Sequence, residues 1–238
     1  MNKNLKYLQN IFLLLMMGFS LCAVQACSDD DDEDRVLDNG NLLISGHEAV
    51  DLGLSVKWAT CNVGASLPED YGGYFAWGET KEKSDYSIDT YKWYDSEKYD
   101  LTKYNDDKDG KTVLDPSDDV ATVKWGKKWR MPTKEEFEEL VDECVWEKTT
   151  LNGVNGRLVT GPNGNSIFLP ATGYRSETDI KYRGGYAQYW SATFSFWELA
   201  YELTYDNGAK DGYYLWYDEC YYGNPVRPVT DESLFNIE

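Results

Sequence analysis

Side-chain oxygens recur at alternate positions in one acidic segment of this 238-residue chain, "YNDDKDGKTVLDPSDD". They belong to Asn105, Asp107 and Asp109. With Gly110 following, this spacing is typical of the first half of a calcium loop, where oxygens converge and glycine permits a sharp turn. Pro116 stands where the closing glutamate belongs, although Asp115 or Asp118 could replace it if the segment folded back. Two interpretations stay open, a calcium site and a solvated acidic turn.

Other catalytic chemistry is restricted by the single histidine, His47. One histidine excludes a multi-histidine metal site and more than one histidine-based triad. Because His47 stands where the domain begins, we expect it to be structural or incidental. The 42 acidic residues offer many carboxylate pairs, but no pair lies in a recognisable catalytic motif. Glycan hydrolysis by two carboxylates therefore remains an alternative, and calcium is the only cofactor considered.

Three cysteines lie well inside the chain. The apolar surroundings of Cys61 ("KWATCNV") and Cys144 ("VDECVW") predict buried free thiols. A disulfide between them is the alternative if the chain is exported. Cys220, in "DECYYG", is expected to be exposed.

Aromatic residues concentrate near the C-terminus, where they form 14 of the 38 residues from 185 to 222. In the strand 213–217, alternation places Tyr214 and Trp216 on the face opposite Tyr213, Leu215 and Tyr217. Only one face of a surface sheet must be core, so the other is expected to expose its rings for binding. The candidate ligand-binding residues are Trp197, Tyr214, Trp216, Tyr217, Tyr221 and Tyr222. Packing in the core is the alternative for them, and it is the preferred role of Tyr189, Trp190 and Tyr205.

The elements that position these residues follow from pattern and caps. A helix is predicted after Thr133, because Thr133 and Glu136 make a capping box ahead of an apolar face. A shorter helix is predicted between a Ser117 cap and Gly126. Strands are expected in 48–65, 71–80 and 156–171 and from 184 onwards, and 81–118 is expected to be a long loop. These elements predict an α+β fold with two helices and an antiparallel sheet.

The N-terminus has the pattern of an export signal. Lys3 and Lys6 precede an apolar run, "IFLLLMMGFSLCAV", of signal-peptide length. The following "VQAC" resembles the lipobox of bacterial lipoproteins, which implies cleavage after residue 26 and lipid attachment to Cys27. An ordinary secretory signal is the alternative. The acidic run "SDDDDED" predicts a solvated tether over 27–42, and it resembles a tag for the outer surface of the Gram-negative outer membrane.

Six blocks in order carry a further resemblance, from about residue 47 to 230. They are "VDLGLSVKWATCNVGA", "YFAWGET", "WGKKWRMPTKEEFEELV", "GPNGNSIFLPATGYR", "YWSAT" and "YYGNPVRPV". Together they resemble the major paralogous domain first named in Fibrobacter, related to the formylglycine-generating-enzyme and C-type-lectin-like folds. The resemblance implies a lectin-like α+β domain whose last third often carries the binding surface. The enzyme branch uses a C-terminal cysteine pair, whereas this chain has only Cys220 there. The sugar-binding motifs of true C-type lectins are absent too.

The sequence thus predicts a signal peptide (1–26), a lipidated acidic tether (27–42), one lectin-like domain (43–230) and a tail (231–238). The expected function is non-catalytic binding of an extracellular glycan or protein at the cell surface. The alternatives are a structural subunit of a surface assembly and a glycan-active hydrolase. The formal charge of −19 disfavours nucleic acid as a partner, and contact with the membrane is expected through the lipid anchor only.

Overall fold

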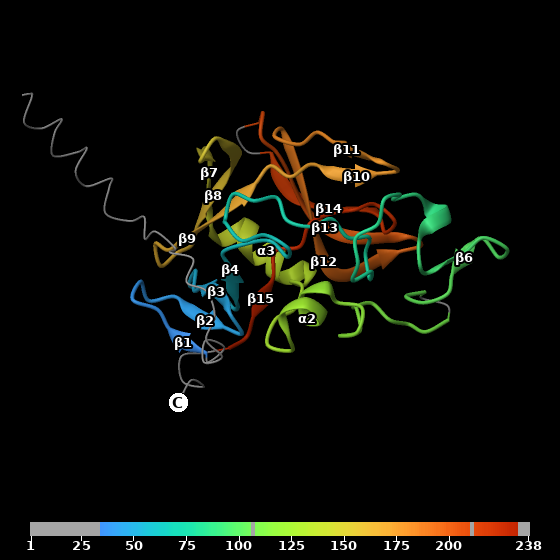
Figure 1. Cartoon of the computed structure of the whole chain (residues 1–238), viewed down its shortest axis with the longest axis horizontal. Coiled ribbons are helices and arrows are strands. Elements are labelled where there is room, and N and C mark those ends of the chain that lie inside the picture. Colours follow the sequence, from blue (N-terminus) through green and yellow to red (C-terminus); the bar gives the residue numbers. More distant parts are fainter. Residues whose placement is uncertain (1–33, 106–107, 210–211, 233–238) are drawn as a thin grey trace, which may run out of the picture. The chain divides into compact units, whose positions relative to one another are not determined.

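Two α-helices and five small antiparallel sheets make up the described part of the chain, so the α+β prediction is confirmed (Figure 1). The computed structural model describes residues 34–105, 108–209 and 212–232. All of them belong to one compact unit, residues 32–238. Within these ranges no helix has the length and apolar character needed to cross a membrane.

The first sheet joins the beginning of the described chain to its end. Its strands, in spatial order, are β1 (Arg35–Val36), β2 (Leu42–Ile44), β3 (His47–Val50), β4 (Lys57–Ala59) and β15 (Val229–Thr230). β15 pairs antiparallel with β4, with Val229 opposite Trp58. The closing segment of the domain is therefore held by a strand that lies about 170 residues before it in the sequence. β3 and β4 confirm the strands predicted in 48–65.

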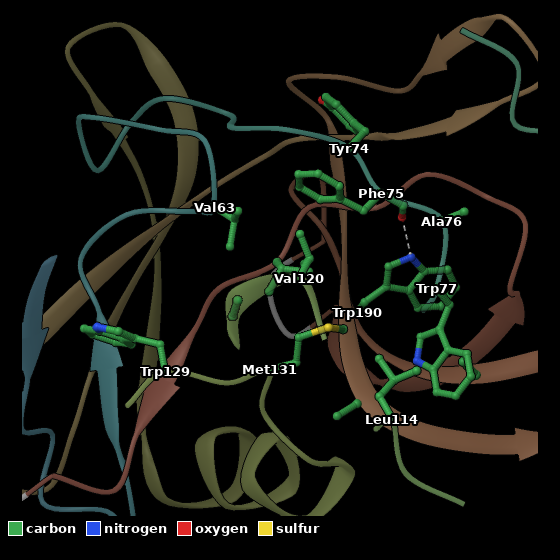
Figure 2. Close-up of a cluster of buried hydrophobic side chains, with 14 of the residues drawn as sticks. Val63, Tyr74, Phe75, Ala76, Trp77, Leu114, Val120, Trp129, Met131 and Trp190 are labelled. Atoms are coloured by element: carbon green, nitrogen blue, oxygen red, sulfur yellow. Dashed lines mark hydrogen bonds between the residues drawn. The ribbon is translucent and has the colours of Figure 1, made fainter. Parts of the chain in front are cut away.

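The segment 81–118 is mostly irregular, as predicted. It contains the short 3₁₀-helix η1 (Ile88–Thr90) and the two-residue strands β5 (Tyr94–Asp95) and β6 (Asp100–Leu101). The strand predicted in 71–80 is wrong, because only an isolated bridge forms there, between Phe75 and Asn224. Tyr74, Phe75 and Trp77 are all buried, so this segment crosses the core instead of lying on a sheet with one wet face. Figure 2 shows Phe75 accepting a hydrogen bond from the Trp190 indole.

Both predicted helices are present. α3 (Lys134–Glu143) has the predicted Thr133 capping box with Glu136, and its buried face contains Phe137 and Leu140. α2 (Val120–Trp125) ends at Gly126 as expected, but its N-cap is Asp119, so the Ser117 cap is wrong. Asp119 caps the helix because its carboxylate accepts from the Thr122 amide at 2.9 Å and also from the Met131 amide at 2.8 Å.

Two three-stranded sheets form the second half of the domain. One contains β7 (Val145–Leu151), β8 (Val154–Thr160) and β9 (Ser166–Pro170), of which β8 and β9 are the predicted pair. The other contains β12 (Tyr186–Phe196), β13 (Leu199–Asp206) and β14 (Tyr213–Glu219), which confirm the late strands. A separate hairpin, β10 (Tyr174–Ser176) and β11 (Asp179–Lys181), was not predicted.

One face of the β12–β14 sheet packs on α3. Tyr189, Leu203 and Tyr205 share a buried cluster with Phe137 and Leu140 of the helix. From the opposite face, Trp190 enters the other core cluster, which Figure 2 shows in part. The predicted core role of Tyr189, Trp190 and Tyr205 is confirmed, since all three are fully buried.

The three cysteines that the structure describes are free thiols, as preferred from the sequence for Cys61 and Cys144. Cys144 is buried and Cys61 half-buried, and burial raises the pKa of both thiols. The predicted exposure of Cys220 is wrong, because this residue is fully buried in the core cluster that contains Tyr91 and Trp77. The chain turns inward after β14, and the Cys220 amide donates to the Glu198 carbonyl. Polar sequence neighbours do not reveal such a turn.

Candidate ligand-binding site

The face of the β12–β14 sheet opposite α3 presents two rows of side chains across its strands. Gln188, Thr204 and Tyr214 are register partners in one row. Trp190, Glu202 and Trp216 are partners in the next. Because side chains alternate along a strand, all six lie on the face opposite α3. Tyr214 and Trp216 remain 47% and 52% exposed.

A cavity of about 640 Å³ lies over this face. Five rings line it: Tyr174, Tyr182, Tyr186, Tyr214 and Trp216. Its polar lining consists of Arg183, Gln188, Asp206 and Asp218. Rings gathered around a few polar groups in a concave space are the usual composition of a small-ligand site.

The β10–β11 hairpin and the turn after it supply one wall. Gly173 forms a bridge with Ala187 of β12, which ties the hairpin to the sheet. Gly173 has φ +63°, and a Cβ there would lie 2.0 Å from the Lys181 carbonyl, so only glycine fits. Arg183 is fixed by Tyr74, whose hydroxyl accepts from its Nη2 at 3.0 Å. The wall is therefore held in place by backbone and side-chain contacts together.

Buried amides and carboxyl groups form the floor. Gln188 Nε2 donates to Glu202 and to Asp218, each at 2.7 Å. The second oxygen of Glu202 accepts from Asn224 Nδ2 at 2.8 Å. Glu202 is fully buried. Desolvation, together with the neighbouring Asp218 charge, raises the pKa of Glu202 well above its usual value.

Glu202→Gln is expected to reduce the loss of stability as pH rises. Above pH 4.5, the usual pKa of this side chain, the unfolded chain releases a proton that folded Glu202 retains. The free energy of unfolding therefore falls as pH rises toward the folded pKa, and a neutral amide removes this contribution. Urea unfolding at pH 5 and pH 8 measures the difference. Hydrogen bonding to Asp218 and burial raise the pKa of Glu219 to about 7. Glu219 therefore makes stability fall with pH to some extent in both the unmodified protein and Glu202→Gln.

The matched control is Glu97→Gln, which changes an exposed carboxylate in the same way. Its free energy of unfolding should fall with rising pH as steeply as that of the unmodified protein. Equal slopes for the unmodified protein and Glu202→Gln would contradict a raised pKa of Glu202 in the folded protein.

The predicted binding aromatics are brought together in part. Tyr214 and Trp216 line the cavity, and Tyr222 lies behind its wall with its ring 5.5 Å from that of Tyr174. Tyr221 contacts Tyr222 and packs against the core. Trp197 lies outside the cavity at the β12–β13 turn, 78% exposed.

Trp197 is nevertheless connected to the cavity by rings. The aromatic row runs Trp197, Phe196, Tyr217, Trp216, Tyr214. Successive ring centroids are 5.5, 5.2, 5.0 and 6.2 Å apart. Tyr217, although it belongs to the other face by alternation, stacks on Trp216 with ring planes 9° apart. The row extends the apolar surface from the cavity to the tip of the hairpin.

Apart from Gly185, which has no side chain, the sequence did not predict seven of the lining residues. They are Tyr174, Tyr182, Arg183, Tyr186, Gln188, Asp206 and Asp218. The alternation that selected Tyr214 and Trp216 also holds in β12, where Tyr186 and Gln188 alternate with the core residues Ala187 and Tyr189. That signal could have identified two of the seven. The wall residues gave no comparable signal, because the β10–β11 hairpin reaches the sheet only through the tertiary fold.

The acidic segment is organised by contacts within the chain. Asp109 accepts from the amides of Tyr104, Asn105 and Lys111 at 3.0–3.1 Å. Asp115 and Asp118 share an ion pair with Lys103. Among the residues that the structure describes, no group of three His, Cys, Asp or Glu side chains could hold a metal ion. Asp107 lies outside these residues, and the calcium site stays a prediction.

Two further sites from the sequence can be placed. His47 stacks on Trp125 with ring centroids 3.7 Å apart, and burial lowers its pKa, which fits a packing role. Cys27, with the signal peptide and most of the tether, lies outside the described residues.

A second cavity, of about 740 Å³, lies beside α2. Its lining is largely aliphatic, with Val113, Leu114, Val123 and Met131. Its carboxylate, Asp119, already caps the helix and accepts from the Met131 amide. The polar groups that could orient a ligand are thus better placed in the first cavity.

Relatives add no further constraint on this site. Comparison of the chain with protein-family models, with curated proteins and with solved structures finds no match in any of the three.

Proposed function

We propose that this chain is a surface-exposed bacterial lipoprotein whose lectin-like domain binds an extracellular glycan without cleaving it. The observation that carries the proposal is the cavity on the β12–β14 sheet, with five rings around a floor of buried amides and carboxyl groups. Rings provide flat apolar surfaces on which the faces of sugar rings stack, at low cost in side-chain entropy. Fixed polar groups between them select the orientation of hydroxyl groups.

A glycan fits this cavity better than a flat protein surface does. Protein partners usually bury about 800 Å² on each side, with anchors in a central patch. Here the rings enclose a concavity whose polar groups are recessed, as Gln188 is almost fully buried. The row from Trp216 to Trp197 offers stacking surfaces beyond the cavity, as a chain of several sugars would need.

A glycan array tests this function directly. The mature chain should bind one family of glycans, and excess soluble glycan should compete. If no glycan binds at high protein concentration, and crosslinking on intact cells yields one dominant protein partner, the chain is better explained as a structural subunit of a surface assembly. New reducing ends released from a bound polysaccharide would show a hydrolase and contradict the non-catalytic assignment.

Membrane anchoring is tested separately at Cys27. Metabolic labelling with a palmitate analogue should mark the protein, and Cys27→Ser should abolish both the label and the membrane association. External protease should digest the anchored protein on intact cells if it faces outward. Labelling that persists in Cys27→Ser would contradict this lipidation site.

A further inference from the structure

We infer that the cavity selects uncharged sugars, which donate hydrogen bonds to its floor, over acidic sugars that carry carboxylate or sulfate groups. This inference rests on the proposed glycan-binding function and specifies its ligand class. It starts from Gln188, which lines the cavity and is almost fully buried. Its Oε1 has no hydrogen-bond partner among the described residues. An unpartnered buried acceptor is costly. Because Oε1 is closed to solvent here, a small rearrangement of the cavity lining must open it before a ligand hydroxyl can reach it and remove that cost.

The orientation of the Gln188 amide is fixed by its surroundings. Its Nε2 lies 2.7 Å from an oxygen of Glu202 and 2.7 Å from an oxygen of Asp218. At these distances Nε2 donates a hydrogen bond to each carboxyl oxygen. Rotating the amide would place Oε1 against the Asp218 carboxylate, where two acceptors would repel each other. A proton on Glu202 does not change this choice, because the Asp218 carboxylate still needs the Gln188 Nε2 donor at 2.7 Å. Gln188 Oε1 therefore stays the free acceptor.

The charges around the cavity also favour uncharged sugars over acidic ones. Asp206 and Asp218 contribute two carboxylates to its lining, against one guanidinium from Arg183. Arg183 is already engaged, since its Nε and Nη2 donate to the Tyr74 hydroxyl and its Cζ lies 4.7 Å from the Tyr71 ring centroid. The whole chain carries a formal charge of −19. An anionic sugar would therefore meet acceptors and like charge, whereas a neutral one meets acceptors for its hydroxyl protons.

The test compares one polysaccharide in two charge states. The probes are a neutral polysaccharide that binds in the array and the same polysaccharide after its primary hydroxyl groups are oxidised to carboxylates. Titration calorimetry of the mature chain should show about tenfold weaker binding of the oxidised form. The double variant Asp206→Asn with Asp218→Asn keeps the side-chain shape and one acceptor oxygen at each position, and it should reduce this ratio to about threefold or less.

Gln188→Met tests the acceptor itself at nearly the same volume. It should weaken binding of the neutral form about tenfold. If this variant does not fold, as a melting curve would show, the double Asp→Asn variant decides alone. Equal or tighter binding of the oxidised form would overturn the inference and leave glycan binding intact. Failure of both forms to bind, for every polysaccharide tried, would instead contradict the proposed function.

Discussion

Trp216→Ala should weaken glycan binding by about thirtyfold, which corresponds to about 2 kcal/mol. Trp216 lines the cavity, is half exposed and connects it to the rest of the aromatic row. Its loss removes the largest stacking surface of the site. The expected cost in folding is small, since the ring lies on the face away from α3. Calorimetric titration with the glycan identified in the array, together with a melting curve, measures both effects.

Three variants make this result specific. Trp216→Phe keeps a flat ring and should recover part of the affinity. Tyr99→Asn removes a ring that is 80% exposed but does not line the cavity, and it should bind normally. Tyr213→Ala should lower stability instead, because Tyr213 stacks on Trp146 with centroids 4.7 Å apart on the core face. Unchanged affinity in Trp216→Ala would rule out this cavity as the binding site.

Arg227→Met should lower the free energy of unfolding by about 3–5 kcal/mol. Arg227 is fully buried, and its guanidinium donates hydrogen bonds in three directions. The acceptors are the Asn62 side chain and the carbonyls of Ala59, Thr60 and Phe168, at 2.8–3.0 Å. These contacts join the end of β4 and the middle of β9 to the segment that leads into β15. A methionine leaves all four acceptors buried without donors.

Arg227→Lys should also destabilise, because one ammonium group cannot replace a planar fork that donates in three directions. Lys98→Met, at an exposed lysine on the surface, should change stability by less than about 0.5 kcal/mol. Urea unfolding followed by tryptophan fluorescence provides the measurement. A midpoint for Arg227→Met that equals that of the unmodified protein would show that these hydrogen bonds contribute no net stability.

Local patterns predicted the local elements well. The Thr133 capping box and the apolar face behind it specify α3, since both depend on residues within one or two turns. Alternation in 213–217 placed Tyr214 and Trp216 opposite Tyr213 and Leu215, and the strand register agrees. The errors occur where distant segments compete. Asp119 replaced Ser117 as a cap partly because it also binds the distant Met131 amide, and Cys220 is buried because the chain turns into a core that its neighbours do not reveal.

The amino-acid sequence by itself determined the class of the fold, the caps of α3, the alternation along β14 and the excess of rings near the C-terminus. These properties depend on neighbours within a few residues and on composition. Only the tertiary structure decided which rings share a cavity, because the β10–β11 hairpin meets the sheet through contacts between residues that local patterns cannot pair. It also decided that Gln188 would be fixed between two carboxyl groups, with one acceptor left for a ligand. Burial of this kind results from the packing of the whole chain, and no short stretch of sequence records it.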